Sequence, residues 1–222
     1  MTTPPPTRAY RSPLRAEKAA ETRRAIVAAA AEVFASSGYA GATMQQVARQ
    51  AGVSLESVNK VGTKAELLIK AFQQTYAGEG GWRSIIDQPE LVEIMSQEDT
   101  EQAIGAYAEF IGAANDRSAG IWAAVRAAAR SEERVSAAVA ELIELKRSDF
   151  VLGHAWYVAR GIADESVPPE AFAAYLYVLT SQETYDQLVH DWGYSPAAYV
   201  AWLRAAILAI GASTRALPPP EA

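Results

Sequence analysis

Apolar residues recur every three or four positions along most of the chain, which is the spacing that places them on one face of an α-helix. No stretch alternates apolar and polar residues in the manner of a β-strand. The first helix is predicted over residues 15–36, and the later helices over residues 44–51, 55–61, 64–77, 89–95, 100–117, 118–130, 131–160, 169–192 and 196–210. The chain is therefore expected to have an all-α fold.

Two of the short predicted helices are joined by a tight turn. Thr43 and Gln46 have the spacing of a capping box, which opens the first of them. Gly52 ends it, because glycine takes the left-handed cap conformation without steric cost. Ser54 caps the second helix, and Gly62 ends it. The arrangement predicts a helix-turn-helix unit.

The second of these helices has an apolar side and a polar side. Val58 and Val61 are expected to face inward, whereas the outer side carries Leu55, Glu56, Ser57, Asn59 and Lys60. A helix with such an outer side suits insertion into the DNA major groove. The alternative is an ordinary helical hairpin with a glycine turn.

Residues 22–76 resemble the N-terminal domain of the tetracycline-repressor (TetR) family of bacterial transcription regulators. The match lies in TRRAIVAAAAEVFASSGYAGAT at 22–43, VARQAGVS at 47–54 and GTKAELL at 62–68. The resemblance implies a three-helix DNA-binding domain and a C-terminal helical bundle that binds an inducer and dimerises through its last two helices. The run SVNKVGTK departs from the family, because it is one residue short and lacks two aromatic residues. Asn59 or Lys60 stands where the family would have a phosphate-contacting tyrosine.

Four segments are predicted on this basis. Residues 1–14 form a disordered basic arm, which either follows the DNA or is a solvated tail. Residues 15–62 form the helix-turn-helix domain, residues 63–215 the ligand-binding and dimerisation domain, and residues 216–222 a disordered tail.

The net charge of −6 conceals an uneven distribution. Residues 1–70 hold ten Lys or Arg and five Asp or Glu, a net of +5, whereas residues 71–222 hold ten and twenty-one, a net of −11. Because charges are screened beyond about 10 Å, the sign of the N-terminal module matters more for phosphate attraction than the total does.

The expected partners are a double-stranded DNA operator, a small hydrophobic or aromatic effector and a second copy of the chain. The residues expected at the DNA are Thr43, Gln45, Gln46, Ser54, Leu55, Glu56, Ser57, Asn59, Lys60, Thr63 and Lys64. Those expected at the effector are Tyr107, Phe110, Trp122, Arg126, His154, Tyr157 and Tyr175. Those expected at the dimer interface are Tyr185, Leu188, Tyr199, Trp202, Leu203 and Ile210.

Each aromatic residue in the C-terminal part also has the plainer interpretation of a core side chain. His154 could touch a ligand or be a core histidine, and Arg126 could pair with an acidic ligand or be a solvated charge. The excess of aromatic residues favours a ligand cavity for the set as a whole.

Other classes of protein find little support. We identify no nucleophile–base pair, phosphate loop or metal-binding cluster, so neither an enzyme nor a cofactor is predicted. No apolar run approaches the ~18 residues of a membrane span, and no signal peptide is predicted. The absence of cysteine fits a reducing cytoplasm. The second hypothesis is a helical small-molecule-binding protein with a weakened DNA-binding module.

Overall fold

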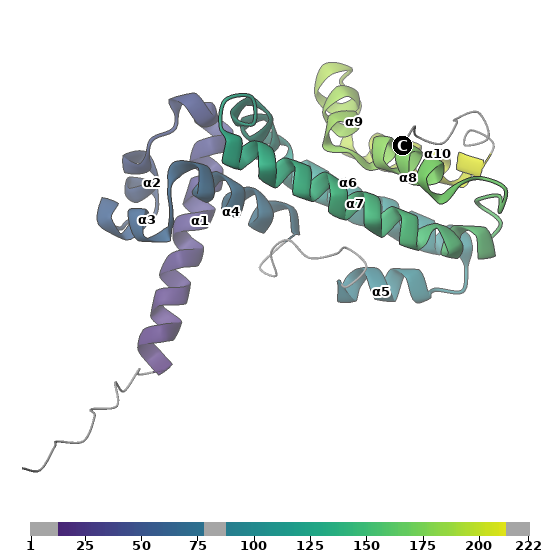
Figure 1. Ribbon diagram of the computed structural model, residues 1–222, viewed down its shortest axis with the longest axis horizontal. Helices are drawn as coiled ribbons and strands as arrows, with labels where there is room; N and C mark the ends of the chain where they lie inside the picture. The colour runs from purple at the N-terminus through teal and green to yellow at the C-terminus, as the bar shows by residue number, and fades with distance from the viewer. Residues whose placement is uncertain (1–12, 78–87, 212–222) are drawn as a thin grey trace, which may run out of the picture.

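The computed structural model describes residues 13–77 and 88–211, and every regular element among them is a helix. The all-α prediction is confirmed over this part of the chain. Residues 1–12 of the arm predicted at residues 1–14 lie outside the described residues, whereas residues 13 and 14 already belong to the first helix. The predicted tail at 216–222 also lies outside the described residues. A small module of helices stands at one end of the molecule and a larger helical body at the other (Figure 1).

The module consists of α1 (Pro13–Gly41), α2 (Met44–Gln50), α3 (Leu55–Val61) and α4 (Lys64–Ala77). Helix α1 is interrupted at Gly38, whose φ of 64° lies in the left-handed region, close to where the sequence predicts its end. The four helices bury one apolar core, which includes Phe34, Val47, Val58 and Leu68.

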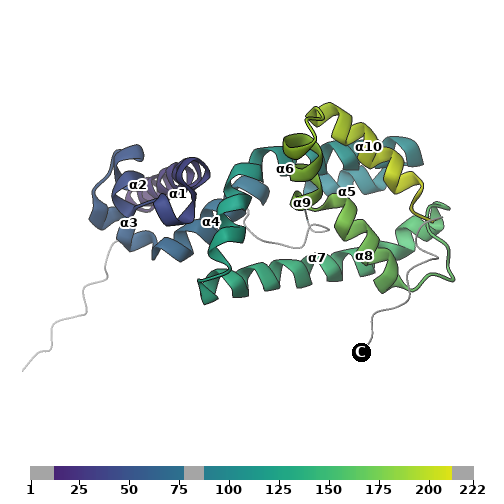
Figure 2. The ribbon, with the colours of Figure 1, turned by 90° about the horizontal axis from the view of Figure 1, so that it is seen from above.

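The body consists of α5 (Pro89–Ser96), α6 (Thr100–Ala128), α7 (Glu133–Ala159), α8 (Pro169–Thr180), α9 (Gln182–Asp186), a π-helical turn at Gln187–Asp191 and α10 (Pro196–Leu208). Helix α6 is central, because it packs against α1, α4, α9 and α10. Helix α8 crosses α7, and α10 lies above α6 (Figure 2). The apolar core of the module continues into the near ends of α6 and α7, where it includes Trp122 and Leu142.

The predicted break at Ser118 is wrong. Residues 100–128 form one continuous helix, and Ser118 is fully buried within it. Its hydroxyl donates a hydrogen bond of 2.7 Å to the carbonyl oxygen of Ala114 on the preceding turn. A serine inside a helix can satisfy its side chain in this way, so it ends the helix only when the backbone also turns.

The predicted single helix over residues 169–192 is also wrong, because the chain breaks at Ser181. The backbone there is extended, and the Ser181 hydroxyl accepts a hydrogen bond of 3.1 Å from the amide of Thr184. Ser181 is therefore a new N-cap. The carbonyl of Thr180 turns toward α6 and accepts from Asn115, a contact between distant residues that helical spacing cannot predict.

A close crossing of α6 and α10 depends on Gly112. A Cβ atom added there would lie 2.5 Å from Cγ2 of Val200, whereas one at Gly105 would lie 3.7 Å from its nearest neighbour, Nε of Arg204. We expect Gly112→Ala to lower the free energy of unfolding by about 1–2 kcal/mol through overpacking. Gly105→Ala should raise it by about 0.5–1 kcal/mol, because alanine is the better helix former. Thermal unfolding of both variants checks the pair, and a stabilising Gly112→Ala would contradict the close crossing.

Candidate nucleic-acid interface and effector site

The turn between α2 and α3 is built as the sequence predicts. The Thr43 amide donates to Oε1 of Gln46 at 2.7 Å, and the Gln46 amide donates to Oγ1 of Thr43 at 3.2 Å, which confirms the capping box. Gly52 has a φ of 66°, and the amide of Val53 donates to the carbonyl of Ala48 at 3.0 Å. This pattern satisfies the last carbonyls of α2 and sends the chain sharply into α3.

Helix α3 is short, but both of its ends are held. The Ser54 hydroxyl accepts from the amide of Ser57 at 3.2 Å, and the ammonium of Lys70 donates to the carbonyl of Val61 at 2.5 Å. Val58 and Val61 are buried, as predicted. The missing residue in SVNKVGTK therefore leaves a regular seven-residue helix with its apolar side inward.

Four side chains form the outer face of α3. Leu55, Glu56, Asn59 and Lys60 are all exposed, whereas Ser57 is half-buried. The Lys60 ammonium lies 2.7 Å from Oε1 of Glu56, and this hydrogen-bonded ion pair lowers the pKa of that carboxyl. A negative charge on this face repels phosphate, so its pairing with Lys60 reduces the repulsion.

The remaining residues predicted at the DNA flank α3. Thr43, Gln45, Ser54 and Thr63 are exposed. Two further residues have roles inside the module. Gln46 is half-buried and uses its carbonyl oxygen in the cap of α2, and Lys64 lies with its ammonium 4.5 Å from the centre of the Tyr39 ring.

Tyr39 joins the module to the turn between α6 and α7. Burial, followed by a hydrogen bond to Glu132, raises the pKa of Tyr39 to about 12. The ring also stacks on Phe34 at 6.1 Å. Tyr39 also packs against the apolar core of the module.

Basic side chains of the body hold α4 at both ends. Arg134 of α7 forms an ion pair with Glu66 in the first turn of α4. At the other end, Nε of Arg117 donates to the carbonyl of Thr75 at 2.8 Å, and its Nη2 donates to that of Tyr76 at 2.6 Å. A cation at the C-terminal carbonyls of a helix also complements the helix dipole.

The seven residues predicted at the effector do not form one site. Trp122 packs on Phe72 at 4.9 Å, in the core that belongs to the module. Arg126 is exposed and paired with Glu183 at 3.2 Å. The other five lie in or against the second core of the body: Tyr107, Phe110, His154, Tyr157 and Tyr175.

His154 lies on the edge of this second core. Its ring centre is 5.1 Å from that of Phe172, and burial lowers the pKa of His154, which favours the neutral ring. Its Nε2 is buried and has no hydrogen-bond partner among the described residues.

The structure adds four buried polar residues that sequence reasoning missed: Asn115, Lys146, Asp149 and Gln182. We call them the buried polar cluster. The Lys146 ammonium donates to Oε1 of Gln182 at 3.2 Å and lies 4.8 Å from the centre of the Tyr76 ring. Within the part of the chain that the structure describes, the Oδ1 atom of Asn115 and the Nε2 atom of Gln182 are buried without a partner. Because buried polar atoms are nearly always paired, these two atoms are exceptions that call for an explanation.

A sequence signal for this cluster does exist. Asn115 interrupts the apolar stripe between Ile111 and Trp122, and Lys146 interrupts the stripe between Leu142 and Phe150. Polar residues at core positions are rare unless they are paired or functional. Burial also raises the pKa of Tyr107 and Tyr157 in the second core, so both phenols stay protonated and can donate hydrogen bonds.

The residues predicted at the dimer interface lie in different surroundings in this chain. Tyr185, Tyr199, Leu203 and Ile210 are buried in its own core, and Leu188 is half-buried. Tyr199 and Leu203 face inward because α6 covers this side of α10, and Tyr185 faces inward because α6 also packs against α9. The exposed part of the predicted set is Trp202, at 39% exposure. Trp192 and Tyr194, which precede α10 in the sequence, are exposed as well.

Two further findings concern other kinds of site. None of the described helices is both long and apolar enough to cross a membrane. Within residues 13–77 and 88–211, no three His, Cys, Asp or Glu side chains are grouped so that they could hold a metal ion.

Comparison with known proteins agrees with this geometry. Residues 26–69 match the model of bacterial regulatory proteins of the tetR family. No curated protein matches the sequence significantly. Among solved structures, a protein from Mesorhizobium loti MAFF303099 described as a TetR-family transcriptional regulator aligns with a TM-score of 0.68 at 20% identity, over 88% of this chain and 98% of its own.

Two other solved structures have similar folds. A transcriptional regulator from Rhodococcus sp. Rha1 aligns with a TM-score of 0.64 at 23% identity, over 88% of this chain and 99% of its own. NalD of Pseudomonas aeruginosa, the secondary repressor of the MexAB-OprM multidrug efflux pump, aligns with a TM-score of 0.58 at 19% identity, over 85% of this chain and 96% of its own.

The capped turn and the exposed face of α3 define a helix-turn-helix protein. Residues 26–69 of its N-terminal module match the model of the tetR family, and the chain has the fold of TetR-family transcriptional regulators.

Proposed function

We propose that this chain is a ligand-responsive transcriptional regulator that binds a palindromic DNA operator as a homodimer. The observation that carries the proposal is α3, a helix capped at both ends with an exposed outer face, in a segment that matches the family's DNA-binding domain. Repression is the proposed direction of control, and one of the similar folds belongs to a repressor. The cytoplasm, where bacterial DNA lies, is the proposed location.

The outer face of α3 would enter the major groove. Asn59 can form a bidentate pair with adenine, and Leu55 can contact a thymine methyl group. Thr43, Thr63 and Lys64 would contact phosphates, since they lie at the N-terminal ends of α2 and α4, where the helix dipole favours a negative charge. These contacts position the protein without reading the sequence.

The dimer would form through the exposed side of α10 and the surface before it. Ala201, Trp202 and Ala205 are exposed on α10, and Trp192 at 78% exposure precedes this helix. Small residues beside a large aromatic one allow two helices to approach closely, and their burial would be favourable.

The effector would bind in the body, at the buried polar cluster. The unpaired atoms of Asn115 and Gln182 could recognise a molecule that supplies one donor and one acceptor, while the surrounding aromatic residues favour an apolar or aromatic body. Lys146 contacts Gln182 on α9 and Tyr76 on α4, so a ligand there could act on the helix that leads to the module. If the effector weakens the affinity for DNA by some factor, then DNA must weaken the affinity for the effector by the same factor, because the two binding equilibria are linked.

Gel shifts on the DNA upstream of the protein's own gene, at two salt concentrations, test the proposal. We expect Asn59→Ala to relax base preference at one position per half-site, at a cost of about 1–3 kcal/mol for the preferred base. Lys64→Ala should weaken binding to all sequences about equally and flatten the salt dependence. Gln102→Ala, an exposed change on α6 in the body, serves as the control.

Two outcomes would count against this assignment. An Asn59→Ala protein with unchanged base preference and a smaller salt slope would place Asn59 over the backbone, where the family has its aromatic residue. A wild-type protein that binds no specific DNA would favour the second hypothesis, a small-molecule-binding protein with a weakened module.

A further inference from the structure

Two opposite charges stand side by side on the outer face of α3. The carboxylate of Glu56 and the ammonium of Lys60 lie 2.7 Å apart, and their side chains are 78% and 72% exposed. The two residues are four positions apart and so project from the same side of the helix. An exposed ion pair of this kind adds little to the stability of a helix, so its two groups can separate towards a bound molecule at small cost.

Glu56 stands at the middle of this outer face. Successive residues of a helix are about 100° apart around its axis, so Val58 lies about 200° and Val61 about 140° from Glu56. Both valines are buried against the rest of the module. Glu56 therefore points almost directly away from the module, and a molecule that meets this face meets the Glu56 carboxylate first.

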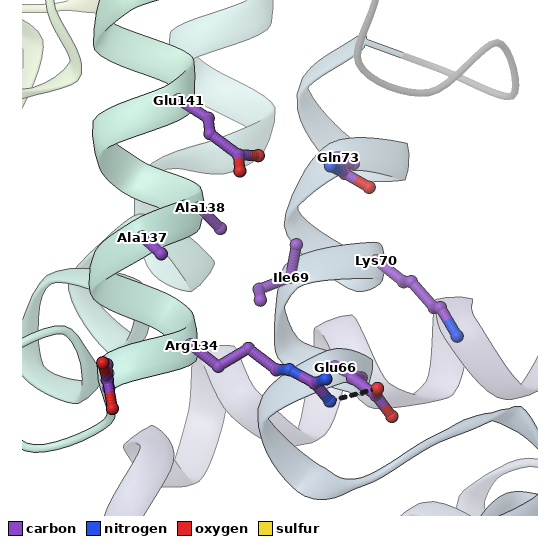
Figure 3. Close-up of a pocket in the computed structure, with 9 residues that line it drawn as sticks. Glu66, Ile69, Lys70, Gln73, Arg134, Ala137, Ala138 and Glu141 are labelled. Atoms are coloured by element: carbon purple, nitrogen blue, oxygen red, sulfur yellow. Dashed lines mark hydrogen bonds and ion pairs between the residues drawn. The ribbon is translucent and has the colours of Figure 1, made fainter.

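Helix α4 holds α3 in this orientation. The Lys70 ammonium donates to the carbonyl of Val61, the last residue of α3, at 2.5 Å. Just beyond, the carboxylate of Glu66 accepts from the amide of Thr63 at 2.8 Å and also pairs with Arg134 of the body (Figure 3). The end of α3 is thus fixed to α4, and α4 to the body, so the charged pair is presented at a defined place.

A carboxylate that enters the major groove needs a hydrogen-bond donor on a base edge, and only cytosine N4 and adenine N6 supply one. Adenine N6 lies between two acceptors, its own N7 and the O4 of thymine, which repel a carboxylate. Cytosine N4 has acceptors on one side only, the O6 and N7 of the paired guanine, and an ammonium binds these two atoms well. A C·G base pair therefore matches a carboxylate beside an ammonium better than an A·T pair does.

We propose that Glu56 and Lys60 together read one C·G base pair in each operator half-site. Glu56 accepts from N4 of the cytosine, and Lys60 donates to O6 or N7 of the guanine paired with it. Because their charged groups are 2.7 Å apart and successive base pairs are about 3.4 Å apart, both reach the same pair. The inference rests on the proposed function, since it takes α3 as the helix in the groove.

The same carboxylate opposes binding to other sequences. Where no cytosine N4 faces it, Glu56 adds an unsatisfied negative charge between two phosphate backbones, and this repulsion weakens non-specific binding. Glu56 thus contributes to specificity in two ways, by accepting from the correct base pair and by penalising the others.

Anisotropy titrations of the full-length protein, on its operator and on every single-base variant of one half-site, test the assignment. We expect replacement of one C·G pair in the half-site to weaken wild-type binding about tenfold or more. Glu56→Gln removes the charge and keeps the size of the side chain. It should abolish this preference, favour A·T at the same position because glutamine pairs with adenine, and bind non-specific DNA at least about threefold more tightly.

Glu101→Gln is the matched control. Glu101 also lies in the first turn of its helix, α6, and pairs with Arg204 at 2.7 Å, so the variant makes the same charge change in the body. We expect its affinity for the operator to stay within about twofold of the wild type, with the same base preference.

A second variant tests the orientation of the pair. Glu56→Lys combined with Lys60→Glu exchanges the two charges and keeps the net charge. The preferred base pair at that position should reverse from C·G to G·C, while thermal unfolding shows an intact fold. Specific binding in which Glu56→Gln and the exchanged protein both keep the preference for C·G would overturn this inference alone, and so would a wild type indifferent to every C·G pair of its half-site. A wild type that binds no specific DNA would overturn the proposed function, and this inference with it.

Discussion

Asn115→Ala should lower the free energy of unfolding by about 2–4 kcal/mol, which corresponds to a fall in Tm of about 5–10 °C for a chain of this size. Asn115 is fully buried, and its Nδ2 donates to the carbonyl of Thr180 at 3.1 Å and lies 3.2 Å from the hydroxyl of Tyr199. One side chain thus connects α6 to the break before α9 and to α10. Alanine would leave buried acceptors without a donor and open a cavity.

Ser118→Ala is the matched control for this prediction. Ser118 is equally buried and lies one turn further along α6, but its hydroxyl bonds only within its own helix. We expect its loss to cost less than about 1 kcal/mol. Thermal and urea unfolding measure both variants, and equal effects would contradict a connecting role for Asn115.

Ala201→Asp should convert the proposed dimer to a monomer and weaken operator binding roughly 100-fold, because two linked half-sites bind far more tightly than one. The substitution places an unpaired charge on the exposed side of α10, beside Trp202. Burying that charge in a subunit contact would be costly. Because Ala201 is exposed, the core around Tyr199 and Leu203 is left intact.

Light scattering and gel shifts on the operator measure this prediction together. Ala140→Asp puts the same charge on an exposed position of α7 and should leave mass and affinity unchanged. An Ala201→Asp protein that stays dimeric would move the interface away from this side of α10.

The helix-turn-helix module is the part of the structure that the sequence predicts best. Its signals are local, because the capping boxes at Thr43 and Thr63 and the turn at Gly52 each act within a few residues. Helical spacing also predicts which sides of α3 and α10 are apolar. Helical spacing cannot show whether the apolar side of a helix is covered by the same subunit or by a partner. Tyr199 and Leu203 were therefore expected at a dimer contact, but they lie in the core of their own subunit.

The candidate effector site was harder to predict, for a related reason. Aromatic residues are prominent in a sequence, yet Trp122 and Tyr107 lie in different cores. The residues that the structure singles out, Asn115, Lys146 and Gln182, are polar residues on mainly apolar sides of their helices. Their meaning depends on contacts between helices that are far apart in the sequence, such as the bond from Lys146 to Gln182.

The N-terminal end of α7 contacts the helix-turn-helix module at two points, one before α2 in the sequence and one after α3. Glu132 bonds to Tyr39 before α2, and Arg134 pairs with Glu66 after α3. Glu132 and Arg134 are only two positions apart, and they hold the module at two places. The module therefore cannot rotate about one contact without breaking the other. In a two-fold assembly this end of α7 would set the distance between the two α3 helices. Operator half-sites lie about 34–36 Å apart, one turn of B-DNA. A small rotation at this end of α7 would therefore change which half-site spacing the protein can span.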